Sequence, residues 1–144
     1  METEIVIKDN IITLDEYLHI RKMVGWKNLS DTQAQKALDN SIYHLGAYED
    51  DKLIGMGRIV GDGAVICYIQ DLIVLPEYQG KGIGSKILSK LISYVKIIGE
   101  ENTEMMLCLM CAKGRERFYE KHGFIARPTD SLGPGMIQYL ELLD

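Results

Sequence analysis

The sequence lacks any apolar run long enough to cross a lipid bilayer. Stretches such as Leu72 to Leu75 fall far short of the roughly 18–20 residues that a transmembrane helix needs. The N-terminus, Met1-Glu-Thr-Glu, is acidic and polar, which is atypical of a secretory signal peptide. We therefore predict a cytoplasmic protein without a membrane partner.

The sequence also lacks an excess of basic residues. It has 16 lysines and arginines against 21 aspartates and glutamates, and its formal net charge is −5. Proteins that bind phosphate backbones usually carry a basic face, so nucleic acid is an unfavourable partner. An acidic protein tolerates a cationic small substrate well.

Cysteine is scarce, with only Cys67, Cys108 and Cys111. An odd count without a signal peptide favours reduced thiols. Cys108 and Cys111 lie three apart in a predicted strand, where their side chains point to opposite faces, so we expect them to pack in the core. No second Cys or His pair completes a zinc set, and His19, His44 and His122 share no metal-binding spacing, so we predict no metal.

Apolar residues make up 47% of the 144 residues, enough for the core of one domain over residues 1–144. The sequence has no internal repeats, low-complexity stretches or linkers. Apolar periodicity and turn residues predict strands over residues 4–8, 42–48, 53–60, 64–75, 104–110, 124–126 and 136–142. Helices are predicted after a Thr13–Glu16 capping box, after Ser30 or Asp31, from residue 83 to 95 and over 114–122. This order predicts an α/β fold, with a mixed sheet of about seven strands that begins as an antiparallel meander and has helices on both faces.

The glycine-rich segment Gln79-Gly-Lys-Gly-Ile-Gly84 follows a strand and opens a helix. Backbone N–H groups at a helix N-terminus carry the positive end of the dipole and bind phosphate. Two known phosphate-binding motifs do not fit this segment. The dinucleotide-binding motif is G-x-G-x-x-G, whereas the glycines here are spaced G-x-G-x-G. A P-loop would need glycine at the position of Ser85 and serine or threonine at the position of Ile87. The alternative to phosphate binding is that this segment is an ordinary tight turn that caps the helix.

A third phosphate motif fits. Gln79-x-x-Gly82-x-Gly84 matches the [QR]-x-x-G-x-[GA] loop of the GNAT acyl-CoA N-acyltransferases, and the stretch from Ile69 to Gly84 resembles that family's central motif. Phe118-Tyr-Glu-Lys-His-Gly-Phe124 resembles its FYxKxGF motif and begins 34 residues after Gly84. The resemblance covers about residues 45–126. It implies a GNAT fold and an N-acetyltransferase that moves the acetyl group of acetyl-CoA to a primary amine of a small molecule or peptide, by direct attack in a ternary complex.

The resemblance also implies where CoA would bind. Backbone groups of Leu72, Ile73 and Val74 would pair with the pantetheine arm. The pyrophosphate would be held by the N–H groups of Gln79, Gly80, Lys81, Gly82, Ile83, Gly84 and Ser85. Lys81 and Lys86 either add positive charge or are solvated surface lysines. Ala112 stands where the family often has an asparagine that contacts pantetheine, so that side-chain contact is missing.

Tyr119 matches the family's general acid, which would protonate the departing thiolate. The usual positions of the base map to Tyr68 and Gln70, neither of which is a base at neutral pH. Deprotonation through water and Asp71 both stay open, although strand alternation turns Asp71 away from Gln70 unless a bulge intervenes.

The first two predicted helices and the meander would form the acceptor pocket. Its candidate residues are Trp26, Tyr43, Tyr68 and Gln70, with Tyr17 and His44 as further possibilities, and core packing is the alternative for each aromatic ring.

Two rival functions remain at this stage. A catalytically silent GNAT module would bind acyl-CoA and regulate a partner, and an unrelated nucleotide binder would use the glycine loop for another phosphate ligand. By analogy with the family, a homodimer is a further possibility.

Overall fold

The computed structural model describes residues 4–142. The chain divides into a first unit that ends at Leu109 and a second unit that begins at Met110. A single domain over residues 1–144 therefore stays a prediction. The helices and strands of the first unit are β1 (Ile5–Asp9), α1 (Leu14–Met23), α2 (Asp31–Asp39), β2 (Tyr43–Glu49), β3 (Lys52–Gly61), β4 (Ile66–Val74), the 3-10 turn η1 (Pro76–Tyr78), α3 (Ile83–Ile98) and β5 (Met106–Leu109).

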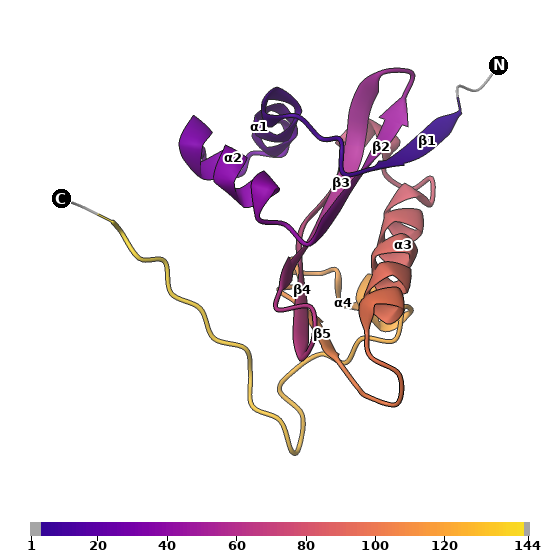
Figure 1. Ribbon diagram of the computed structural model, residues 1–144, viewed down its shortest axis with the longest axis vertical. Coiled ribbons are helices and arrows are strands. Elements are labelled where there is room, and N and C mark those ends of the chain that lie inside the picture. The colour runs from indigo at the N-terminus through magenta and orange to yellow at the C-terminus, as the bar shows by residue number, and fades with distance from the viewer. Residues whose placement is uncertain (1–3, 143–144) are drawn as a thin grey trace. The chain divides into compact units, whose positions relative to one another are not determined.

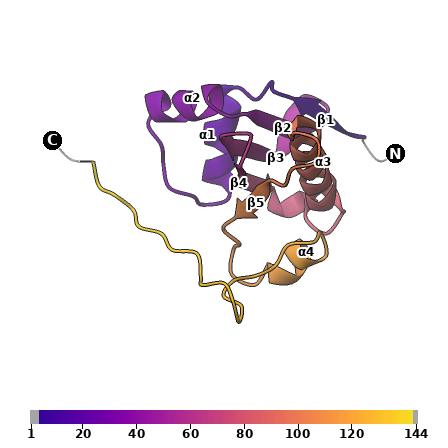
Figure 2. The same ribbon diagram turned by 60° about the horizontal axis from the view of Figure 1, so that its bottom comes forward.

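The first unit is built on a five-stranded mixed sheet. The strand order is β1-β2-β3-β4-β5; the first four strands form an antiparallel meander, and β5 runs parallel to β4. Helices α1 and α2 cover one face of this sheet and α3 covers the other (Figures 1 and 2). The predicted mixed α/β architecture with helices on both faces is confirmed.

Local sequence signals explain where the helices begin. Thr13 and Glu16 form the predicted capping box of α1, and Ser30 and Gln33 form a second box that begins α2, which settles the choice between Ser30 and Asp31. Helix α3 packs through one apolar stripe along its length. The buried residues of this stripe are Ile83, Ile87, Leu88, Leu91 and Val95.

The predicted number of strands is too high. Residues 124–126 and 136–142 belong to no strand in the described part of the chain, and the helix predicted over 114–122 is shorter, α4 (Glu116–Glu120). A strand exists only where a neighbouring strand completes its hydrogen-bond ladder, and sequence periodicity does not supply that neighbour.

The cysteine expectation holds only in part. Cys67 is buried and Cys108 partly buried, but β5 ends at Leu109, so Cys111 lies outside the strand and is exposed. Core packing of Cys111 was therefore a wrong prediction. Among residues 4–142, no group of three His, Cys, Asp or Glu side chains is placed to hold a metal ion. Within the same range, every helix is too short or too polar to cross a membrane.

The β3–β4 hairpin depends on Gly61, and this dependence gives a test of the fold. Its φ is +135°, and a Cβ atom there would lie 2.4 Å from the Ile66 carbonyl oxygen. We expect Gly61→Ala to lower the free energy of unfolding by about 2 kcal/mol or more, because both the backbone angle and the space require glycine. Gly99→Ala is the matched control: φ is −67° there and the nearest atom is 3.6 Å from the added Cβ. Urea denaturation measures both, and equal losses would contradict the assignment.

Candidate active site

Strand β4 contains a β-bulge at Asp71. On the β3 side the register pairs Met56 with Ile73 and Arg58 with Gln70, so one residue of β3 faces two residues of β4. Asp71 has a φ of +58°, which is unusual for a non-glycine residue. The bulge was the condition under which Asp71 and Gln70 could share a face, and the sequence alone did not reveal it.

Beyond the bulge, β4 continues without β5 beside it. The last parallel pair joins Ile69 to Leu109, whereas β4 extends to Val74. Within the described residues, the β5-facing edge of β4 therefore has no strand partner after Ile69. Leu72, Ile73 and Val74, the predicted pantetheine contacts, lie in this stretch, where backbone groups can bind an extended ligand.

The glycine loop connects η1 to α3. Gly80 and Gly82 have φ values of +79° and +81°, and Gly82 is the N-cap of the 16-residue helix α3. The amide side chain of Gln79 donates to the carbonyl oxygen of Val74 at 2.9 Å, which ties the loop to the end of β4. The left-handed backbone at Gly80 and Gly82 explains why glycine stands at both positions.

The N-terminus of α3 is suited to an anion. Its first ladder bond runs from the Lys86 N–H to the Gly82 carbonyl oxygen, so the amides of Ile83 and Gly84 precede the ladder. A Cβ atom at Gly80 or Gly82 would meet no atom within 4 Å, which leaves open space above the loop. Together with the positive end of the dipole, these groups can bind a phosphate or pyrophosphate.

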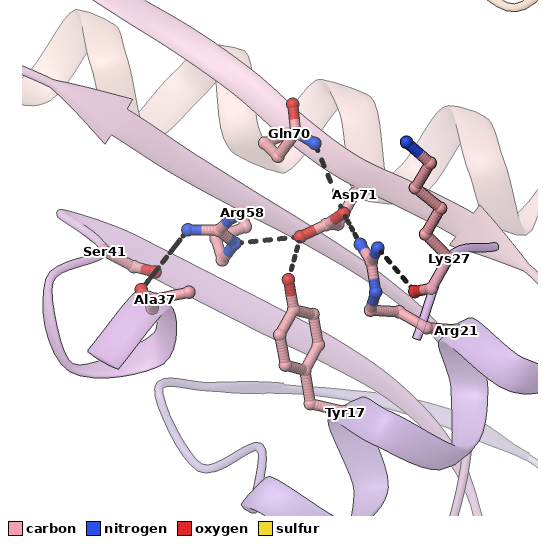
Figure 3. Close-up of polar contacts among 8 residues, drawn as sticks. All are labelled: Tyr17, Arg21, Lys27, Ala37, Ser41, Arg58, Gln70 and Asp71. Carbon is pink, nitrogen blue, oxygen red and sulfur yellow. Dashed lines mark hydrogen bonds and ion pairs between the residues drawn. The ribbon is translucent and has the colours of Figure 1, made fainter. Parts of the chain in front are cut away.

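Asp71 is the centre of a buried polar network (Figure 3). Its Oδ2 accepts hydrogen bonds from the Tyr17 hydroxyl and from Arg58 Nε, the latter at 3.0 Å. Its Oδ1 accepts from Arg21 Nη1 at 2.8 Å, and Gln70 Nε2 lies 3.5 Å from the same oxygen. The side chain of Asp71 has no exposed surface. Both of its oxygens are therefore occupied by donors.

The hydrogen bonds of this network argue against Asp71 as a general base. A general base needs a lone pair directed at the substrate's proton, and the Asp71 oxygens already accept from two guanidinium groups and a phenol. Burial and, next, the Asp71 charge raise the pKa of Tyr17 to about 12, so the phenol stays protonated and donates. These contacts favour a structural role for Asp71, and its role as base stays a prediction.

The candidate acceptor residues occupy different places. Trp26 is 40% exposed and lies beneath the Arg21 guanidinium at 5.3 Å, while Tyr68 and Gln70 are half-buried on β4. Tyr43 is buried instead, stacks on Tyr94 of α3 at 4.1 Å and donates its hydroxyl to Asp9. Tyr43 thus packs against α3, on the face of the sheet opposite α1 and α2.

Sequence reasoning missed two arginines and one cavity. Arg21 is four residues after Tyr17, so both lie on one face of α1, but nothing in the spacing shows that they meet a carboxylate of β4. Arg58 stands in an apolar strand; its Nη1 also donates to the Ala37 carbonyl oxygen at 3.3 Å.

A cavity of about 190 Å³ lies beside Arg21, lined by Leu18, Arg21, Lys22, Lys27, Asn28 and Leu29.

His44 lies in the same buried region. It is 8% exposed, and its pKa is lowered by burial and by the charge of Arg58. A neutral imidazole at this position is compatible with the adjacent guanidinium.

In the second unit, Tyr119 of α4 lies in an aromatic cluster. Its ring meets Phe118 edge-on at 5.1 Å and Phe124 at 5.9 Å. Burial raises the pKa of Tyr119 above its ordinary value, and Cys111 raises it further. The phenol is therefore protonated at neutral pH, as a general acid must be.

Comparisons with known proteins agree with this geometry. The family model of the acetyltransferase (GNAT) domain matches residues 40–126. An uncharacterized N-acetyltransferase ycf52-like protein of Prochlorococcus marinus is 31% identical over 123 residues, which are 83% of this chain and 64% of that protein. The chain thus spans less than two thirds of that relative's length.

Two solved structures are similar over nearly the whole chain. One is a probable acetyltransferase of unknown function from meticillin-resistant Staphylococcus aureus, with 32% identity and a TM-score of 0.82, covering 94% of this chain and all of that one. The other is a GNAT family acetyltransferase from Streptococcus pneumoniae, with 32% identity and a TM-score of 0.80, covering 96% of this chain and all of that one. The predicted resemblance and fold type are confirmed.

The Asp71 network predicts a large effect from one carboxylate. We expect Asp71→Asn to lower the free energy of unfolding by about 3 kcal/mol, because it leaves the nearly buried Arg21 and Arg58 without their counter-charge. Lys90→Gln is the control, since it removes an exposed ion pair with Asp9 and should cost less than about 1 kcal/mol. Urea denaturation at neutral pH compares them. If Asp71 were instead only a catalytic base, the substitution would abolish turnover and leave stability unchanged.

Proposed function

The chain belongs to the GNAT acetyltransferase family, and from this premise we propose that it transfers the acetyl group of acetyl-CoA to a primary amine of a small molecule or peptide. The observation that carries the proposal is the glycine loop at the N-terminus of α3, held by Gln79 against the end of β4. The loop lies at the end of β4, whose β5-facing edge has no strand partner after Ile69 among the described residues, and this arrangement supports a phosphate-bearing, extended cosubstrate.

In this proposal the backbone binds most of the cosubstrate. The amides from Gln79 to Ser85 hold the pyrophosphate, with Lys81 and Lys86 nearby in sequence. The edge of β4 at Leu72 and Val74 pairs with the pantetheine arm, and a backbone N–H at the bulge stabilises the oxyanion. We assign acceptor binding to the α1 side of the sheet, where the candidate residues are Trp26, Tyr68 and Gln70.

The proposed reaction is a direct transfer. The neutral amine attacks the thioester carbonyl, a C–N bond forms, and the C–S bond then breaks. Tyr119 gives its proton to the departing thiolate. The amine's own proton leaves through water near Tyr68 and Gln70, since the Asp71 oxygens are occupied; Asp71 is the second choice for the base.

One observation favours the rival function of a silent acyl-CoA-binding module. Neither Tyr68 nor Gln70 is a base at neutral pH, and Asp71 is enclosed by Tyr17, Arg21 and Arg58. Tight acetyl-CoA binding without turnover on a broad panel of amines would support this module. We further propose that the protein acts in the cytoplasm on its acceptor without a metal ion, a membrane or nucleic acid.

Calorimetric titration tests the cosubstrate. We expect saturable binding of acetyl-CoA and of desulfo-CoA, unmatched by ATP. Gly82→Ala should weaken acetyl-CoA binding at least about tenfold, because a side chain strains the left-handed backbone of the loop. Gly25→Ala is the matched control, since Gly25 also has a positive φ, +74°, and open surroundings but lies outside the loop. Absence of binding at millimolar ligand would overturn both the enzyme and the silent module.

Tyr119→Phe tests the general acid. We expect turnover, followed as thiol release, to fall by roughly 100-fold while acetyl-CoA affinity stays nearly unchanged, because only the proton donor is lost. Tyr48→Phe also removes a buried phenol, one that donates to Glu16, and should leave turnover close to that of the natural chain. Unchanged turnover of Tyr119→Phe would remove Tyr119 from this role.

A further inference from the structure

The cavity beside Arg21 has a strongly cationic lining. It is formed by the second half of α1 and by the segment that links α1 to α2. Three of its six lining residues are cations, one is an amide, two are leucines and none is acidic: Leu18, Arg21, Lys22, Lys27, Asn28 and Leu29. The sequence as a whole has a formal net charge of −5, so the charge of this lining is opposite to the net charge of the chain.

The buried network next to the cavity adds to this positive charge. Within the described residues, the ion pairs of Arg21 and of Arg58 are both made with Asp71. Two guanidinium groups therefore share one carboxylate, and one positive charge is left in excess. Such a charge is only partly screened by water at a nearly buried position, so the cavity beside it favours an anionic ligand.

The guanidinium of Arg21 is held in a fixed position. It lies 5.7 Å from the centre of the Tyr17 ring and 5.3 Å from that of Trp26. Its Nη1 donates to Asp71, and its Nη2 donates to the Lys27 carbonyl oxygen at 3.2 Å (Figure 3). Its Nε is buried and has no acceptor among the described residues. A guanidinium that is already ordered binds an oxyanion with little further loss of conformational entropy.

Arg21 also connects the cavity to the bulge in β4. It lines the cavity and donates to Oδ1 of Asp71, and Gln70 Nε2 lies 3.5 Å from the same oxygen. Gln70 is one of the residues to which we assign the acceptor amine. An amine at the bulge and an anion in the cavity are thus separated by about one side chain, so one small molecule or chain end can carry both groups.

We propose that the acceptor amine carries a carboxylate or phosphate group and that the cavity beside Arg21 binds this anion. The inference rests on the proposed function, since it names the class of amine that the same site acetylates. The side chain of Arg21 is 12% exposed and supplies a fixed donor, whereas Lys22 and Lys27 are exposed and add charge. Ionised donors make the stronger hydrogen bonds to carboxylates and phosphates, so amines without an anionic group are poor acceptors.

Fluorescence tests the anion site without turnover, because Trp26 beside Arg21 is the one tryptophan of the sequence. Glycylglycine and O-phosphoethanolamine are titrated in phosphate-free buffer, with and without desulfo-CoA, against glycylglycinamide and ethanolamine, which lack the anion. We expect at least one anionic amine to give a saturable change and to bind at least about tenfold more tightly than its counterpart. The tighter of the two anionic amines identifies the preferred group.

Two variants assign this binding to the cavity. The double variant Lys22→Gln/Lys27→Gln should remove most of the preference for the anionic amine, because it deletes two charges of the lining. Lys36→Gln is the matched control, since Lys36 is an exposed lysine of α2 outside the cavity lining, and it should change the affinity less than about twofold. Circular dichroism shows that each variant is folded. Equal affinity for anionic and neutral amines, no saturable change with either anionic amine, or an unaltered preference in the double variant would overturn the proposal.

Thiol release then connects the cavity to the acceptor. With acetyl-CoA, the natural chain should have a kcat/KM at least about tenfold higher for the anionic amine than for its neutral counterpart. The double variant should lose this advantage mainly through KM, because the lysines bind the substrate and do not react. Equal use of the neutral amine would show the proposal to be wrong. If the anionic amines bind but no amine releases thiol, the proposed function fails, whereas the anion site at the cavity is supported.

Discussion

The buried carboxylate of Asp71 joins three parts of the first unit. It accepts from Tyr17 and Arg21 of α1 and from Arg58 of β3, and Arg58 in turn contacts the end of α2 through Ala37. A charge enclosed in this way is costly unless its partners are in place, so the network couples both helices to the bulged strand. The network fixes the bulge in β4, and the bulge marks the start of the candidate acetyl-transfer site.

The site combines two kinds of backbone irregularity. At the bulge, Asp71 has a left-handed backbone conformation, and in the glycine loop Gly80 and Gly82 have one too. Glycine supplies the loop conformation at little steric cost, whereas Asp71 needs its ion pairs to hold it in place. The candidate site thus depends on local sequence at the loop and on tertiary contacts at the bulge.

This difference explains what the sequence could predict. The capping box at Thr13 and the glycine loop that opens a helix depend on residues close together in the chain, and both are found at the predicted positions. For the second helix the sequence left Ser30 and Asp31 as alternative caps, and Ser30 is the cap. The bulge depends on the register between β3 and β4, and the partners of Asp71 come from residues up to 54 positions away. The orientation of Tyr43 could not be predicted either. An aromatic residue on a strand can face either side of the sheet, and here Tyr43 faces α3. The strand predicted over 136–142 had the right composition but no neighbour in the described chain.

The difference in length between β4 and β5 has an evolutionary consequence. Strand β4 continues to Val74 whereas pairing with β5 stops at Ile69, so among the described residues this edge of β4 offers main-chain groups that every amino acid except proline provides in full. Side chains at Leu72 and Val74 can therefore change without removing the main-chain groups to which we assign the proposed cosubstrate. Under the proposed function, mutation can alter the acceptor side of the sheet one side chain at a time, and a lineage can acquire new acceptors while the proposed cosubstrate site stays intact.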